Sequence, residues 1–230
     1  MSNTVKLSKA TLEILQNYSS INTNILIQEG NKLATMAINK TILGEASSLT
    51  DVFPQEFPIY NLAELLNVIS LFKEPSLEFN GKIVTVSEAS GKGMKIKYMA
   101  SSKDILVYPE KSVKEPPYEV NFELSAEDLN NILRSAAAIN GPDIQIIGSG
   151  SGIVLKVTDK KVPTSNDVVL EVSDEPQDNT FTFNFRTENL KLIPGGYNIS
   201  ISSKLLSKFE HKEKAGLVWF LPLEKDSTFE

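Results

Sequence analysis

The sequence has no cysteine and a single histidine, His211, among its 230 residues. These absences exclude a disulfide framework, a thiolate zinc site, a cysteine nucleophile and a metal site built from several histidines. Long hydrophobic runs are also missing, because the longest, Leu217–Leu223, is far shorter than the roughly 20 residues that span a bilayer. The first nine residues lack the apolar stretch of a secretory signal. We therefore expect a cytoplasmic protein that is neither exported by a simple signal nor membrane-spanning.

Charge is distributed unevenly along the chain. Hydrophobic residues make up 41% and charged residues 23%, which is the composition of an ordinary globular protein. The formal net charge is −6, and all of it lies in the second half: residues 1–115 hold 12 Lys and 12 acids, whereas residues 116–230 hold 11 Lys or Arg and 17 acids. Since clustered Lys and Arg make most phosphate contacts, an acidic chain is not the usual nucleic-acid binder.

The two halves share a pattern that indicates an internal duplication. Apolar residues recur at helical spacing over 7–21 and again over 125–139, and each segment opens with a serine suited to the N-cap. The segments align at a separation of 118 residues, as in Ile14-Leu15 against Ile132-Leu133. Because one offset aligns both the apolar and the polar faces, we interpret the chain as two similar domains.

The rest of each half is predicted to form antiparallel strands and one more helix. Further helices are expected over 60–72 and over 187–193, and Pro194 ends the second of these. Short apolar runs separated by turn signals predict the strands. The charged, proline-containing stretch 109–117 predicts a linker, because proline is excluded from central strands. We therefore expect an α+β fold with domains over 1–108 and 118–230.

No catalytic constellation emerges from the sequence. Gly91-Lys92-Gly93 lacks the spacing and the following Ser or Thr of a phosphate loop, and a hairpin turn explains it better. His211 lies in a charged stretch without a second group to orient it, so we expect a solvated loop residue rather than a general base. The acids at 174–178 lack the ladder of oxygen ligands of a calcium loop. The sequence therefore predicts no enzyme, no metal and no cofactor.

The polar faces of the four predicted helices are the least acidic part of the chain. Their charges sum to zero and they are rich in amides, so the whole excess of −6 lies outside them. Taken alone, this pattern is typical of an ordinary solvated helix face.

A series of short motifs follows one another along the chain: Lys6–Lys9, Ile21-Asn22, Ile59–Leu62, Ala126–Leu129, Ile132–Arg134, Asn189–Lys191 before Pro194-Gly195, Lys208–Glu210 and Leu223–Thr228. In this order they closely resemble the sliding clamps of T-even-type bacteriophages, which are DNA polymerase processivity factors. The resemblance runs from the first helix to the last few residues.

The resemblance implies a DNA clamp fold in a trimeric ring of six similar domains, with antiparallel sheets outside and two helices per domain lining a hole for duplex DNA. It implies as partners the replicative DNA polymerase, an ATP-driven clamp loader and, in late transcription, a sigma-like factor and a coactivator, all in the host cell cytoplasm. A closed ring stays on DNA without tight contacts. Since a trimer would carry a net charge of −18 and repel DNA, a need for a loader is expected.

The resemblance also implies which residues face the DNA. Amides and single cations suit water-bridged contact with a moving backbone. The predicted DNA-facing residues are Lys9, Gln16, Asn67, Lys73, Asn131, Arg134 and Lys191.

Two protein-binding surfaces follow from the same resemblance. Ring closure should pair edge strands head to tail, and Asp104–Tyr108 is the expected edge strand of the first domain, with Ile105, Val107 and Tyr108 at the subunit interface. Hydrophobic tails of partners should enter a pocket walled by Val218, Phe220, Pro222 and Leu223. Packing of Trp219 and Phe220 in the core of the last strand explains the same pattern equally well.

Two other functions remain as alternatives. A duplicated β-rich phage structural or scaffold protein without a DNA role would pack its helices inward or against partners. An unrecognised hydrolase would need paired carboxylates near one pocket.

Overall fold

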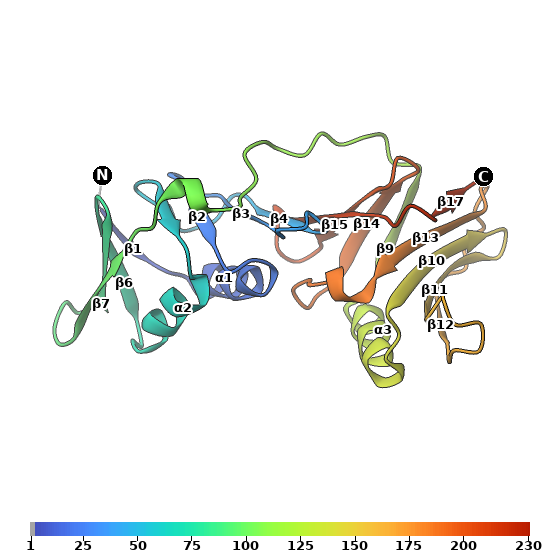
Figure 1. Ribbon diagram of the computed structural model, residues 1–230, viewed down its shortest axis with the longest axis horizontal. Helices are drawn as coiled ribbons and strands as arrows, with labels where there is room; N and C mark the ends of the chain where they lie inside the picture. Colours follow the sequence, from blue (N-terminus) through green and yellow to red (C-terminus); the bar gives the residue numbers. More distant parts are fainter. Residues whose placement is uncertain (1–2) are drawn as a thin grey trace. The chain divides into compact units, whose positions relative to one another are not determined.

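The computed structural model describes residues 3–230, and the chain divides into two compact units, Met1–Ser112 and Val113–Glu230 (Figure 1). The boundary between the units falls within the stretch 109–117, where the sequence indicated a linker. None of the helices in the described residues is long and apolar enough to cross a membrane.

The first unit combines two α-helices with antiparallel strands. One sheet has the strand order β1-β6-β7-β8, a separate pair joins β2 to β5, and β3 and β4 form a hairpin. The elements are β1 (Thr4–Lys6), α1 (Lys9–Ile21), β2 (Ile25–Ile27), β3 (Leu33–Met36), β4 (Leu43–Ala46), β5 (Phe57–Ile59), α2 (Leu62–Ser70), β6 (Pro75–Asn80), β7 (Ile83–Glu88), β8 (Lys95–Met99) and the 3-10 helix η1 (Lys103–Ile105).

The second unit is richer in strands and has one α-helix. Its larger sheet has the order β12-β11-β10-β13-β17, and four more strands follow the order β16-β15-β14-β9. The elements are β9 (Val120–Leu124), α3 (Ala126–Ile139), β10 (Asp143–Ser149), β11 (Gly152–Thr158), β12 (Val168–Ser173), β13 (Phe181–Arg186), the 3-10 helix η2 (Thr187–Asn189), β14 (Tyr197–Ser202), β15 (Leu206–His211), β16 (Leu217–Pro222) and β17 (Thr228–Phe229).

Local chemistry explains where the helices begin. Ser8 and Ser125 cap α1 and α3, because each side-chain oxygen accepts a hydrogen bond from a free N–H of the first turn. Asn61 caps α2 in the same way. The capped ends agree with the sequence-based bounds within two residues, so the three predicted helices are confirmed.

The fourth predicted helix is wrong in extent. The segment expected to be helical over 187–193 forms only the 3-10 turn η2, and the Lys191 N–H donates to Asn189 O. Too few residues separate η2 from Pro194 for another turn to complete its hydrogen bonds, since proline has no N–H to donate. The second unit therefore offers one α-helix and one short turn.

The expected strand over Asp104–Tyr108 is also wrong. Lys103–Ile105 forms η1, and Val107 pairs with two asparagine side chains instead of a strand: its N–H donates to Asn24 Oδ1 at 3.0 Å, and its carbonyl accepts from Asn22 Nδ2 at 2.9 Å. Because the N–H and the carbonyl of Val107 are both hydrogen-bonded inside the unit, this segment does not act as an edge strand. The long edge strand of the sheet is β8.

His211 is not a solvated loop residue. It ends β15 and is only 3% exposed. Nδ1 accepts hydrogen bonds from the N–H groups of Glu213 and Lys214, while Nε2 lies 3.3 Å from Pro194 O. The imidazole therefore joins the turn after β15 to the loop that precedes β14.

Candidate functional site

The exposed faces of the helices carry the polar residues that the sequence singled out. Each helix buries its opposite side: α1 buries Ile14, Leu15 and Tyr18, and α3 buries Leu129 and Ile132. All the predicted DNA-facing residues are exposed, namely Lys9 and Gln16 on α1, Asn67 on α2, Lys73 beyond its end, Asn131 and Arg134 on α3, and Lys191 after η2.

Lys191 is held on an irregular loop rather than on a helix. The loop is anchored by Ile193, which is buried, and the carbonyls of Ile193 and Pro194 are contacted by Tyr197 Oη and His211 Nε2. A Cβ on Gly195 would lie 2.3 Å from His211 Nε2, so only glycine fits there. The loop therefore has a defined path although it lacks regular secondary structure.

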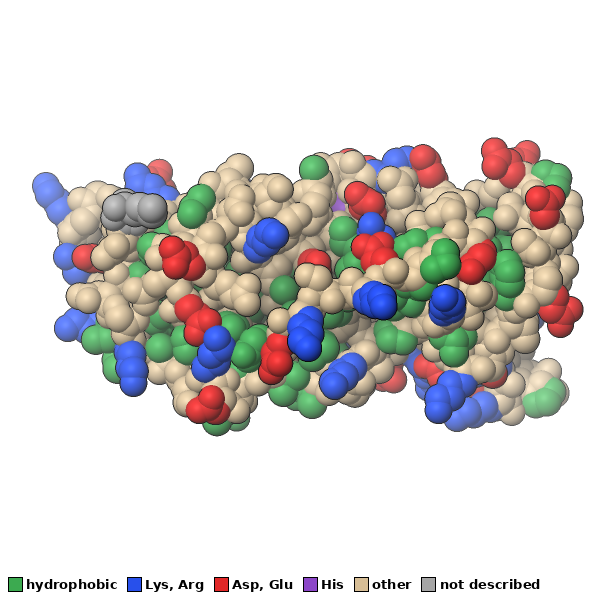
Figure 2. Space-filling view, turned by 90° about the horizontal axis from the view of Figure 1, so that it is seen from above, with side chains coloured by type: hydrophobic (Ala, Val, Ile, Leu, Met, Phe, Trp, Pro, Cys, Tyr) green, Lys and Arg blue, Asp and Glu red, His purple; other side chains and the backbone are tan. Residues whose placement is uncertain are grey.

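Charges on the surface are mixed in sign. Figure 2 shows a face on which Lys and Arg side chains stand among Asp and Glu side chains instead of forming one cluster. Within residues 3–230, no group of three or more His, Asp or Glu side chains could hold a metal ion. The described residues on the face drawn in Figure 2 therefore form no single strongly basic patch.

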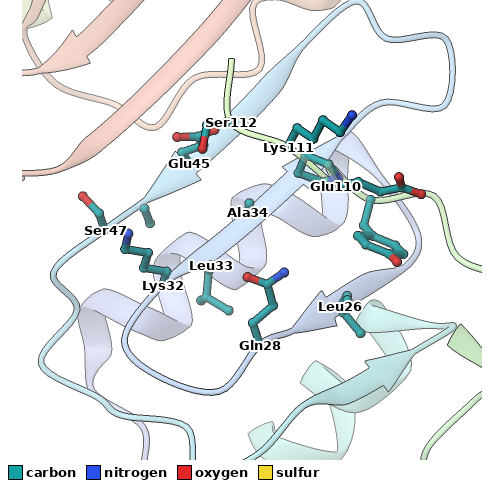
Figure 3. Close-up of a pocket in the computed structure, with 13 residues that line it drawn as sticks. Leu26, Gln28, Lys32, Leu33, Ala34, Glu45, Ser47, Glu110, Lys111 and Ser112 are labelled. Carbon is teal, nitrogen blue, oxygen red and sulfur yellow. The ribbon is translucent and has the colours of Figure 1, made fainter. Parts of the chain in front are cut away.

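A cavity of about 190 Å³ lies in the first unit, between the strands β2 to β4 and the chain that follows Leu106 (Figure 3). Leu26 and Leu33 supply apolar lining, and the segment 108–112 forms one side. Its charged lining residues are Lys32, Lys111, Glu45 and Glu110. The lining combines a few apolar side chains with polar and charged ones, a mixture that suits the binding of a peptide side chain.

Two buried asparagines fix the start of this cavity wall. Asn22 and Asn24 hold the Val107 peptide groups, and Asn22 Nδ2 also donates to Met36 O at 2.8 Å. Leu106 packs inward beside them. These hydrogen bonds therefore fix the position from which Tyr108 and the residues after it continue.

The strands β8 and β12 are open sheet edges with opposite charge. In the described residues, β8 pairs with β7 alone and β12 with β11 alone. Residues 89–102 contain three lysines and no acid, whereas residues 166–178 contain five acids and no Lys or Arg. Apolar side chains are exposed on both: Met94 at 51%, Met99 at 61% and Val169 at 56%.

Comparison with known proteins connects these features. Residues 6–103 match the family described as "DNA polymerase processivity factor", and residues 121–220 match "gp45 sliding clamp, C terminal". The sliding clamps of Escherichia phage RB69 and Enterobacteria phage T4 are each 30% identical to this chain, covering 97% of it and 99% of their own length. The chain belongs to the sliding-clamp family. Sliding clamps are processivity factors without enzymatic activity, which agrees with the prediction of no enzyme.

Solved clamp structures share the fold. Proliferating cellular nuclear antigen from Entamoeba histolytica superposes with a TM-score of 0.70 at 14% identity, covering 97% of this chain and all of that one. The β clamp of Helicobacter pylori has a TM-score of 0.69 at 10% identity, with 98% of this chain and 66% of that chain covered. The predicted clamp fold is confirmed, and residues 3–230 form three α-helices in place of the expected four.

Of the residues predicted to wall the clamp's partner pocket, Val218, Phe220 and Pro222 share one face of β16, because side chains alternate along a strand. Phe220 and Leu223 are 5% and 6% exposed and pack in the core, while Val218 is half-buried and Pro222 is exposed. The cavity beside 108–112 is not among the sites expected from the sequence. The aromatic Tyr108 directly before Pro109 was the available signal, since an exposed linker has little need of an aromatic ring.

Proposed function

We propose that three copies of this chain close into a ring around duplex DNA and hold the replicative polymerase there. The observation that carries the proposal is the exposed polar face of the helices, which presents amides and single cations such as Gln16, Asn131 and Arg134 while the opposite side is buried. A ring of this kind keeps DNA by topology while its amides and few cations make weak contacts with phosphates. Strong contacts would slow sliding, so the sparse cations agree with the function.

Replacing Lys9, Arg134 and Lys191 together by Glu tests the DNA-facing surface. We expect the amount of ring loaded on nicked circular DNA to fall by at least ~10-fold, because the contacts with phosphates become repulsive while the ring closes around DNA. The measurement compares the amounts of variant and wild-type ring that a fixed amount of loader places on circular DNA. The matched control reverses three exposed cations away from these faces, Lys161, Lys204 and Lys225. Equal loading of the two triple variants would remove these residues from the DNA-facing set.

An ATP-driven loader is part of the proposal for an electrostatic reason. A trimer with a net charge of −18 repels DNA at long range, so spontaneous threading of DNA is slow. The role in late transcription stays a prediction of the family resemblance alone.

Ring closure is proposed to pair β8 of one copy with β12 of the next. The pairing is head to tail, because the two edges differ, and such contacts close when the rotation permits. The lysines of the first edge then face the acids of the second, and the exposed Met99 and Val169 become buried. Of the interface residues predicted from sequence, Ile105 is 55% exposed, whereas Val107 and Tyr108 are half-buried.

Partner tails are proposed to anchor in the cavity beside 108–112. Ala34→Phe should fill the cavity and weaken binding of a hydrophobic polymerase tail peptide by about tenfold or more, since each 1.4 kcal/mol lost is tenfold in affinity. Fluorescence anisotropy of the labelled peptide measures the affinity. Ile38→Phe, at an exposed turn of the same hairpin, is the matched control. Normal binding by Ala34→Phe, with loss of binding in Val218→Ala, would place the pocket at the last strand instead.

A further inference from the structure

The five-stranded sheet of the second unit has two unlike edges. One edge is β12, six residues long and paired only with β11. The opposite side of the sheet ends at β13, and the last residues of the chain lie along it as β17 and the loop before it (Figure 1). One edge is therefore open over a whole strand, whereas β13 is paired with the last residues of its own chain.

Residues 224–230 form hydrogen bonds with outward-facing peptide groups of β13 and of Thr180, which precedes this strand. Thr180 and Glu230 exchange two main-chain hydrogen bonds of 3.0 and 2.9 Å. Further along, Asn184 O accepts from the N–H of Glu224, and the Asn184 N–H donates to Ser227 Oγ. A two-residue strand and one side chain thus replace the ladder that a full strand would provide.

A buried asparagine ties this segment to the sheet. Asn184 is 3% exposed, and its Nδ2 donates to both the carbonyl and the carboxylate of Asp226. Lys160 Nζ lies 2.7 Å from Asp226 Oδ2. The hydrogen bond from Lys160 lowers the pKa of Asp226, although burial opposes this, so the carboxylate stays charged at neutral pH. These contacts hold a segment that buries little apolar surface of its own.

An uncovered β13 would be a strong template for another strand. Its side chains include the stacked rings of Phe181 and Phe183, and Phe229 of the final strand lies 6.2 Å from Phe183 between ring centroids. Unpaired, apolar strand edges recruit strands of other chains. In a subunit that already offers β12, a second receptive edge would allow branched assemblies that cannot close.

We propose that residues 224–230 are an edge guard, which closes β13 so that the second unit of each subunit accepts a neighbour at β12 alone. The proposal rests on the ring described above, because it explains how a single direction of assembly is enforced. Asp226 and Ser227 are the residues through which the guard is held.

The test uses the full-length double variant Asp226→Ala with Ser227→Ala, a second variant ending at Leu223, and Lys225→Ala as a control in the same segment. Light scattering across a dilution series measures mass. We expect both guard variants to form species at least about twofold heavier than wild type, increasing with concentration, while Lys225→Ala matches wild type. Variants that are folded by circular dichroism and have the wild-type mass at every concentration would overturn the guard.

The two proposals fail in different ways in this experiment. A wild type that is not retained on circular DNA argues against the ring, whatever the guard variants do. The guard is judged only by the mass of the variants relative to wild type, which does not require a stable ring.

Discussion

Lys95→Glu combined with Lys97→Glu should abolish ring closure and the processivity that depends on it. Both lysines lie on β8, and the proposed partner edge carries Glu171 and the acids after β12. Like charges set face to face across an interface cost several kcal/mol, so we expect trimer dissociation to shift by about 100-fold or more in concentration. Light scattering across a dilution series measures the shift, and primer extension with the loader present measures the loss of long products.

Charge reversal on the partner edge is the control for this prediction. Glu171→Lys with Glu175→Lys should weaken closure alone, and combining it with the two lysine reversals should restore most of the trimer. A restored trimer would show that the two lysine reversals had not simply unfolded the protein, because two further substitutions would not refold it. If the reversed lysines leave the trimer intact, or if the combined variant stays dissociated, the pairing of β8 with β12 is wrong.

Much of the fold could be predicted because its information is local. The period of apolar residues and the caps Ser8, Asn61 and Ser125 fix α1, α2 and α3 within short windows of sequence. The same windows place the exposed polar faces, since burial of one side leaves the other to solvent. The internal repeat at a separation of 118 residues extended the prediction to the second unit.

The errors arose where distant residues decide the structure. The alternation of Ile105 and Val107 is typical of a strand, but Asn22 and Asn24, more than 80 residues earlier, take the peptide groups that pairing needs. The charged neighbours of His211 favour a solvated loop, whereas the side chain is buried. Its burial follows the two-residue period of β15, in which Ser207 and Phe209 are also buried, and this period was the signal in the sequence.

The edge guard could not be foreseen for a similar reason. The sequence Leu223–Thr228 marks family resemblance, yet nothing in it names Asn184 and Lys160 as its partners. Only the folded sheet brings these residues to Asp226. Surfaces that govern assembly are therefore the least accessible to sequence reasoning, because they depend on which strand lies at an edge.

Asp143→Ala should cause the largest loss of stability in the second unit. The Asp143 side chain is fully buried, and its carboxylate accepts from Arg186 Nη1 at 2.7 Å and from the Lys160 N–H at 3.2 Å. Removing one partner of a buried ion pair costs about 3–5 kcal/mol, and the partial exposure of Arg186 favours the lower value. Urea unfolding followed by the fluorescence of Trp219, the only tryptophan, reports on this unit.

A surface ion pair of the same unit gives the matched control. Asp167→Ala breaks the pair with Lys156, whose partners are 48% and 30% exposed, and should cost at most about 1 kcal/mol. Equal losses in the free energy of unfolding for the two variants would show that burial does not determine how much the Asp143 ion pair stabilises the unit. Because Asp143 also fixes the backbone of Lys160, which holds Asp226, its loss should loosen the edge guard as well. We therefore expect Asp143→Ala to form heavier species at urea concentrations where Asp167→Ala keeps the wild-type mass.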